Sequence, residues 1–117
     1  MSEHPTFDSY GYPTDETLKT IEEWPYTDDF RLLMDYVQEA WADYGWFERC
    51  APEVAEAMDG DRDCHDGHWW CYATGGWSGN ESIIGALERN AIFHFYAWYC
   101  SVRGGYGEYH VRPDSSV

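Results

Sequence analysis

The residues best suited to bind a metal lie in one short stretch, Cys64-His65-Asp66-Gly67-His68-Trp69-Trp70-Cys71. Zinc takes four tetrahedral ligands, commonly Cys thiolates and His imidazoles. Cys64, His68 and Cys71 have workable spacing, and Cys50 or His65 could complete the set. However, the paired C-x2-C knuckle is absent, and a strand here would point His68 and Cys71 to opposite faces. The sequence therefore favours no cofactor, with thiols buried as small hydrophobes; a structural zinc on Cys64, His68, Cys71 and Cys50 is the alternative.

Calcium is a weaker candidate. Asp59, Asp61 and Asp63 alternate like the start of a calcium-binding loop. Such a loop needs Gly at its sixth position and Glu at its twelfth, and those positions hold Cys64 and Trp70. We expect a solvated acidic loop here.

No catalytic motif accompanies the four Cys and five His of the chain. A nucleophile needs a neighbouring base, and signatures such as G-x-S-x-G are missing. The glycine-rich turn at 75–79 lacks the lysine of a phosphate loop, and Glu81 would occupy the positive end of the following helix. Seven Lys and Arg in a chain of net charge −15 form no basic footprint for nucleic acid. We expect a protein that is not an enzyme and does not bind nucleic acid directly.

Acidic residues dominate one half of the chain. Residues 1–66 contain eighteen Asp and Glu against four Lys and Arg, a net charge of −14, whereas residues 67–117 carry −1. Such a charge distribution attracts basic surfaces and steers association. The candidate partner-binding residues are a stripe at every fourth position of a predicted helix, together with an acidic loop: Asp35, Glu39, Asp43, Asp59, Asp61, Asp63 and Asp66.

Charge density limits what this stripe could imitate. One carboxylate per helical turn gives a charge about every 6 Å, whereas duplex DNA carries one about every 1.7 Å. Several acidic segments would therefore have to share one face. Acidity that serves solubility alone is an equally open interpretation.

The first half must position these acids. Residues 1–26 contain Pro5, Pro13 and Pro25 and are predicted to form a partly ordered arm, with a short helical turn at 15–23. Apolar residues at helical spacing predict a helix over 28–44, with Thr27 or Asp28 as N-cap and Gly45 at its end. Residues 50–58 are predicted to form a second short helix. The apolar face of the main helix consists of Phe30, Leu33, Met34, Val37, Trp41 and Tyr44.

The second half of the chain is predicted to form the strands and helix on which the domain is built. Trp69 to Tyr72 favour a strand over 68–74. Ser78 and Glu81 have the spacing of a capping box, and the helix that follows should bury Ile83, Ile84 and Leu87 and stop near residue 90. Residues 92–102 fit either a strand or a helix. Residues 104–105 predict a tight turn into a last strand over 106–111, and 113–117 a disordered tail.

Together these elements predict one α+β domain over 27–112. A small antiparallel sheet of about three strands would pack against two main helices. Aromatic residues make up 19% of the chain, which is enough for a sizeable core. The chain has no apolar run of membrane-spanning length and no secretory signal. We therefore expect an intracellular protein whose cysteines are free thiols or metal ligands rather than disulfides.

The segment TGGWSGNESIIGALERN, followed by RGGY and an aromatic strand, resembles a group of small phage and prophage proteins. The likeness covers about residues 69–111 and leaves out the acidic half. It brings no catalytic residue with it, but it implies a phage-encoded accessory protein. Small acidic phage proteins as a class include anti-restriction and anti-CRISPR inhibitors that imitate DNA.

The sequence thus predicts a non-enzymatic inhibitor in the cytoplasm of a host cell. Its carboxylates would occupy the basic nucleic-acid channel of a host defence protein, with exposed Trp and Tyr as anchors. The alternative is a small zinc-stabilised structural or regulatory module, in which the acids only aid solubility.

Overall fold

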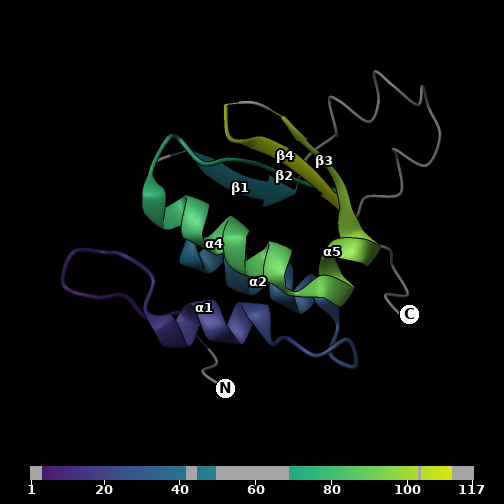
Figure 1. Cartoon of the computed structure of the whole chain (residues 1–117), viewed down its shortest axis with the longest axis horizontal. Coiled ribbons are helices and arrows are strands. Elements are labelled where there is room, and N and C mark those ends of the chain that lie inside the picture. The colour runs from purple at the N-terminus through teal and green to yellow at the C-terminus, as the bar shows by residue number, and fades with distance from the viewer. Residues whose placement is uncertain (1–3, 42–44, 50–68, 103, 112–117) are drawn as a thin grey trace.

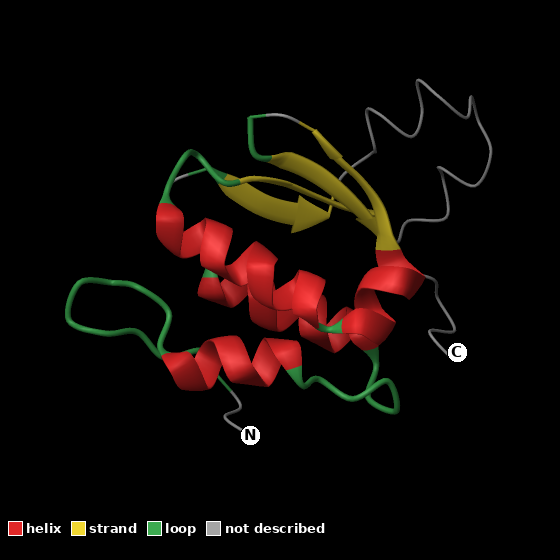
Figure 2. Ribbon diagram, in the orientation of Figure 1, coloured by secondary structure: helices red, strands yellow, loops and turns green. Residues whose placement is uncertain are grey.

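The computed structural model describes residues 4–41, 45–49, 69–102 and 104–111. This part of the chain forms four helices and four strands (Figures 1 and 2). In chain order they are α1 (Asp15–Glu22), α2 (Phe30–Ala40), β1 (Trp46–Arg49), β2 (Trp69–Ala73), α4 (Ser78–Arg89), α5 (Ala91–Ala97), β3 (Trp98–Val102) and β4 (Tyr106–His110). The predicted α+β class is confirmed.

The strands form one antiparallel sheet in the order β1-β2-β4-β3. Strand β1 is the one that the sequence analysis missed, so the sheet has four strands rather than about three. The predicted turn between β3 and β4 is confirmed: Gly104 and Gly105 have φ of 98° and 86°, a region that only glycine enters without strain.

Helices cover one face of the sheet. Figure 1 shows α2 and α4 between the sheet and α1, while α5 turns the chain from α4 into β3 at one end. Helix α1 packs mainly on α4 and less on α2. The segment predicted as a partly ordered arm therefore supplies a helix that packs against the domain.

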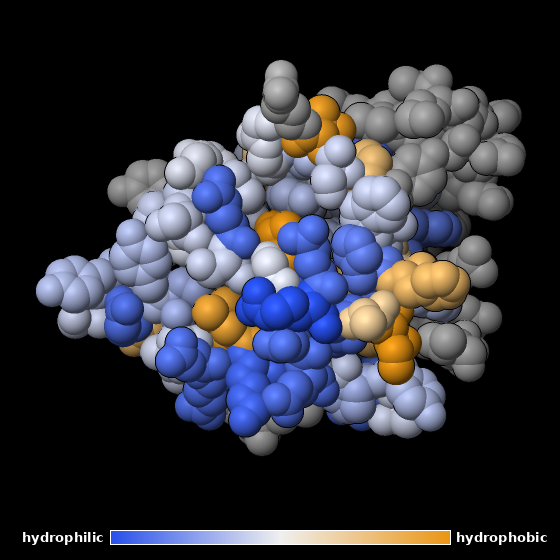
Figure 3. Space-filling model, viewed as in Figure 1, coloured by the Kyte–Doolittle hydropathy of each residue, from blue (hydrophilic) through white to orange (hydrophobic). Residues whose placement is uncertain are grey.

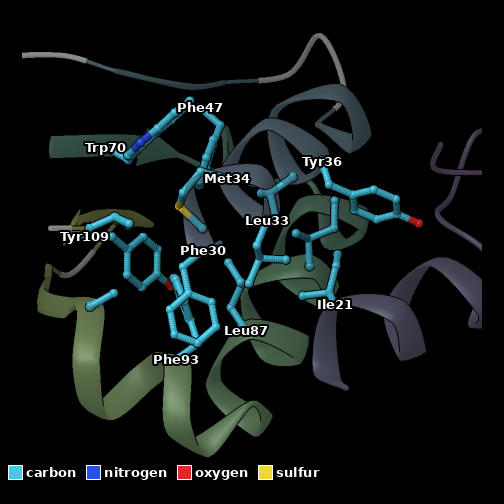
Figure 4. Packing of buried hydrophobic residues seen from close by; sticks show 14 of the residues in the cluster. Ile21, Phe30, Leu33, Met34, Tyr36, Phe47, Trp70, Leu87, Phe93 and Tyr109 are labelled. Carbon is cyan, nitrogen blue, oxygen red and sulfur yellow. The ribbon is translucent and has the colours of Figure 1, made fainter. Parts of the chain in front are cut away.

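The core lies between the sheet and the helices. Ring contacts run across it, with Phe93 of α5 5.3 Å from Phe30 and 5.2 Å from Tyr109 between ring centroids. Burying each such side chain stabilises the fold by about 1.5–3 kcal/mol. The residues labelled in Figure 4 are Ile21, Phe30, Leu33, Met34, Tyr36, Phe47, Trp70, Leu87, Phe93 and Tyr109.

Helix α2 is shorter than the periodicity predicts. Its N-cap is Asp29, one residue beyond the predicted caps, with Oδ1 accepting the Arg31 N–H at 2.8 Å. It ends at Ala40, and Trp41 is extended. The Trp41 ring packs 5.2 Å from Phe47 and 5.8 Å from Tyr72. The prediction that the helix continues through Trp41 was wrong because this contact with the sheet draws the chain out of the helix.

In the second half, one prediction needed correction and one open alternative is resolved. The N-cap of α4 is Trp77, whose side chain makes no capping bond, and Ser78 already belongs to the helix. Residues 92–102 are both helix and strand, because Asn90 caps α5 and Trp98 then begins β3. The predicted helix over 50–58 and the predicted tail at 113–117 lie outside the described residues.

Candidate partner-binding surface

Two of the seven predicted partner-binding acids lie in the described part of the chain. Asp35 and Glu39 are exposed and one turn apart on α2. Glu39 pairs with His4, whose Nδ1 lies 2.9 Å from Oε1. Asp43, Asp59, Asp61, Asp63 and Asp66 lie outside the described residues. The predicted continuous face therefore stays a prediction.

The described residues carry a broader acidic surface than the predicted stripe. Their Lys and Arg side chains are Lys19, Arg31, Arg49 and Arg89, and three of these four pair with acids of the same chain. The distances are 3.9 Å for Lys19–Glu23, 2.6 Å for Arg31–Asp29 and 3.3 Å for Arg89–Glu22.

Eight other surface carboxylates make no ion pair with any described cation. We call these residues the acidic surface. They come from α1, α2, α4, β1 and two loops: Asp8, Asp15, Glu16, Asp28, Asp35, Glu48, Glu81 and Glu88. A basic partner would therefore meet carboxylates that no described Lys or Arg neutralises.

Helix α1 is the most densely acidic element described. Asp15 and Glu16 lie in its first turn, where the helix dipole favours them, and Glu22 and Glu23 lie at its end. Four carboxylates over a helix about 12 Å long give about one carboxylate per 3 Å. Because Glu22 and Glu23 pair with Arg89 and Lys19, the unpaired carboxylates of α1 amount to about one per 6 Å, more dilute than duplex DNA. Figure 3 shows hydrophilic side chains gathered over α1 and α4. The sequence predicted a short helical turn at 15–23, which is α1, but its acids were not among the predicted partner-binding residues.

A cavity of about 280 Å³ opens between α4 and the β3–β4 hairpin. Glu81 and Glu88 lie two turns apart on α4 and both line it, while Ile84 and Val102 provide apolar wall. Carboxylates beside apolar wall suit an ammonium or guanidinium on an alkyl stem. Its other lining residues are Tyr72, Thr74, Ser101, Gly105 and Tyr106.

The negative charge of Glu88 affects a tyrosine of the sheet, Tyr72. Burial raises the pKa of the Tyr72 hydroxyl above its ordinary value, a hydrogen bond with Ser101 opposes this, and the negative charge of Glu88 raises that pKa further. The charge of Glu88 thus acts on Tyr72, which lines the same cavity.

The cysteines depart from the prediction. Cys71 is disulfide-bonded, whereas free thiols or metal ligands were predicted. Because a disulfide sulfur offers no thiolate to a metal, Cys71 cannot serve as a zinc ligand in this state. The other candidate ligands, Cys50, Cys64 and His68, lie outside the described residues. Within the described residues, no three His, Cys, Asp or Glu side chains are grouped to hold a metal ion.

Cys100 is a free thiol on the sheet face that lies away from the helices. Its Sγ donates to Oε1 of the buried Glu108 at 3.7 Å, and Tyr106 donates its hydroxyl to Oε2 at 2.5 Å. Burial, and then the charge and hydrogen bond of Glu108, raise the pKa of Cys100 to about 11. At neutral pH this thiol is protonated, and a protonated thiol is a poor nucleophile.

None of the helices in the described part of the chain has both the length and the apolar character needed to cross a bilayer. Comparison with protein-family models, curated proteins and solved structures finds no match. The resemblance to phage proteins and the origin that it implies stay predictions, and the function must be argued from the surface itself.

Proposed function

We propose that this protein is a non-enzymatic inhibitor that binds the basic nucleic-acid channel of a host defence enzyme, of the anti-CRISPR or anti-restriction type. It would be phage-encoded and act in the host cytoplasm, presenting a carboxylate-rich surface in place of DNA. The observation that carries the proposal is the acidic surface, whose eight carboxylates have no described cation in ion-pair range.

Charge density requires that several elements act together. A stripe with one acid per turn is too dilute to imitate a duplex, and so is α1 alone, whose unpaired carboxylates are Asp15 and Glu16. The cavity beside α4 adds a place where one Lys or Arg side chain could insert between Glu81 and Glu88. A basic channel would supply such side chains along its whole length.

The disulfide at Cys71 bears on where the protein acts. Structural disulfides persist in oxidising compartments, while the cytosol keeps thiols reduced. Action in the host cytoplasm therefore requires that partner binding survives reduction of this bond. The zinc-stabilised module stays an alternative for the reduced protein, and elemental analysis after reduction distinguishes it: stoichiometric zinc favours the module.

The test is capture of partners by the tagged full chain from a bacterial lysate, at about 50 and about 500 mM NaCl, with and without reductant. We expect a nucleic-acid-binding protein to be retained at low salt, released at high salt and displaced by added duplex DNA. The purified pair should then show loss of DNA binding by the partner. Retention that changes neither with salt nor with added DNA would contradict the proposal.

A pair of variants with equal net charge separates mimicry from general acidity. In the first, Glu16→Gln, Asp35→Asn and Glu88→Gln remove three carboxylates from three helices. In the control, Ser9→Lys, Gln38→Lys and Ser82→Lys change the net charge equally and keep every carboxylate; all six side chains are exposed. Mimicry predicts at least a tenfold loss of affinity in the first variant and a smaller loss in the control, whereas equal losses would indicate nonspecific steering.

A further inference from the structure

An apolar groove lies at the end of the molecule where α5 meets the loop between α1 and α2. Tyr26, Ala91, Ile92 and Phe95 line it, and its volume is about 350 Å³. Phe95 is 93% exposed, Tyr26 53% and Ile92 46%. Figure 3 shows hydrophobic side chains gathered over α5 beside the hydrophilic area. Exposed apolar side chains that adjoin one another mark an interaction site more often than scattered ones do.

Hydrogen bonds hold the backbone around this groove. The Asn90 side-chain amide donates to the carbonyls of Ile21 and Trp24 at 3.1 and 3.0 Å, which ties the start of α5 to the end of α1. The Asp28 N–H donates to the Pro25 carbonyl at 3.0 Å and closes a turn that contains Tyr26. The groove is therefore preorganised, and little ordering would be needed on binding.

Helix periodicity explains why the apolar side chains of α5 point outward. Phe93 and Ala97 are buried in the core, so positions 92 and 95 fall on the opposite side of the helix. Ile92 and Phe95 lie three residues apart and are neighbours on that side. No contact with the described core requires an aromatic residue at a position that is 93% exposed.

Acidic residues flank the groove-lining residues in the sequence. Asp28 follows Tyr26 by two residues, Glu88 precedes Ala91 by three, and both are exposed members of the acidic surface. The cations nearest in sequence, Arg31 and Arg89, are already paired with Asp29 and Glu22. An occupant that is apolar and also basic would complement both the groove and its surroundings.

We propose that the groove binds an amphipathic segment of the partner, with an apolar face flanked by Lys and Arg. The inference rests on the proposed function, because the segment would belong to the same basic protein. Phe95 is the anchor that packs between apolar side chains of the segment, while Asp28, two residues from Tyr26, meets a flanking cation. A second copy of this chain would bring its own acidic surface and a net charge of −15 against the first, and an anionic membrane is repelled in the same way.

The probe is a synthetic peptide of about 18 residues, built from Leu and Lys so that one helix face is apolar. A second peptide has the same composition in scrambled order and therefore the same charge. Affinities for the full chain are measured by fluorescence anisotropy at about 150 mM NaCl. We expect the amphipathic peptide to bind at least tenfold more tightly than the scrambled one.

Phe95→Ser is the informative variant, because a side chain that is 93% exposed is not needed for folding. Tyr10→Ser is the matched control, since Tyr10 is 83% exposed and does not line the groove. Phe95→Ser should weaken binding of the amphipathic peptide about tenfold and leave binding of the scrambled peptide unchanged. Tyr10→Ser should change neither affinity by more than about twofold.

The outcomes separate this inference from the function on which it rests. Equal, salt-sensitive binding of both peptides, unchanged in Phe95→Ser, would overturn the groove proposal and leave the charge-based function standing. Tight binding of the amphipathic peptide, with no nucleic-acid-binding protein captured from lysate, would overturn the function and keep the groove. Sedimentation that shows a wild-type dimer, dissociated by Phe95→Ser, would overturn the groove proposal in favour of self-association.

Discussion

Asn90 holds three segments together with one side chain. Its Oδ1 accepts the Phe93 N–H at 3.3 Å and caps α5, and its Nδ2 donates to Ile21 and Trp24. The residue is 6% exposed, so water cannot replace these bonds easily. The packing of helices α1, α4 and α5 against one another thus depends on a side-chain amide, which can donate and accept hydrogen bonds at the same time.

Replacing Asn90 by Ala should destabilise the fold by about 2–4 kcal/mol, the sum of a lost cap and the lost bonds to the Ile21 and Trp24 carbonyls, of which Ile21 keeps the Trp24 N–H as a donor. Asn90→Asp keeps the cap acceptor but loses both donors, so it should not rescue stability. Urea unfolding measures the change, with the exposed Ser82→Ala as a control expected to cost less than about 0.5 kcal/mol. A loss below about 1 kcal/mol for Asn90→Ala would contradict this account.

Because the Cys100 thiol is protonated in the fold, the free energy of unfolding decreases at alkaline pH. Its pKa is raised in the fold from an ordinary value of 9.0 to about 11. The folded state therefore keeps the proton over that range while the unfolded chain releases it. Stability is complete below pH 9 and is lost as pH rises towards 11.

We expect the free energy of unfolding to fall between pH 9 and 11, and to fall less steeply in Cys100→Ala. Burial raises the pKa of Tyr109, and of Tyr72, so the variant should keep part of the slope. Denaturant titrations at each pH measure this, and identical slopes in the two proteins would contradict it. Alkylation of Cys100 at pH 8 should also be slower than that of an ordinary thiol.

At the scale of elements, the β3–β4 hairpin depends on two adjacent glycines for different reasons. Both have positive φ, but a Cβ at Gly104 would meet nothing within 4 Å. A Cβ at Gly105 would lie 2.3 Å from Thr74 Oγ1. Thr74 is fixed here because its N–H donates to the Gly105 carbonyl at 3.0 Å. Gly105 therefore allows the hairpin to approach the end of β2.

Gly104→Ala should cost only the left-handed backbone penalty, about 1–2 kcal/mol. Gly105→Ala should cost a further 1–3 kcal/mol for the forced contact with Thr74. The double variant Gly105→Ala/Thr74→Ala should recover part of that difference. Chemical denaturation of the wild type and these three variants tests this. Equal losses of stability for Gly104→Ala and Gly105→Ala would show that the contact of the new Cβ with Thr74 is relieved without cost.

The elements that the sequence predicted well are those fixed by local chemistry. The aromatic run of β2 and the double glycine before β4 need no tertiary information. The end of α2 could not be found in this way, because Trp41 continues the helical pattern but packs on the sheet. Strand β1 was missed because four residues, Trp46–Arg49, carry too little pattern. Of the candidate site, the acidity was predictable, but the role of α1 was not.

At the scale of the whole molecule, the net charge of −15 opposes folding. The described part alone has thirteen Asp and Glu against four Lys and Arg. Self-repulsion among such charges raises the free energy of the compact state. Salt screens this repulsion, with a Debye length that falls from about 30 Å at 0.01 M to about 8 Å at 0.15 M.

Added NaCl should therefore stabilise the protein while it weakens partner binding. We expect the thermal midpoint to rise between about 10 and 300 mM NaCl. The rise should shrink near pH 4, where many carboxylates are protonated. Differential scanning calorimetry at the two pH values measures this. A midpoint that falls with salt at pH 7 would mean that the ion pairs outweigh the repulsion.

Among the described residues, the order β1-β2-β4-β3 also leaves two strands without an outer neighbour, and an open edge is a template for aggregation. Strand β1 is only four residues long and ends in the exposed Glu48 and Arg49. Strand β3 pairs with β4 through a register shift between Trp98 and Cys100. A further chain would find one edge short and charged and the other irregular. The layout of the described sheet thus offers a further chain little regular edge to pair with, in a protein whose residues are 19% aromatic.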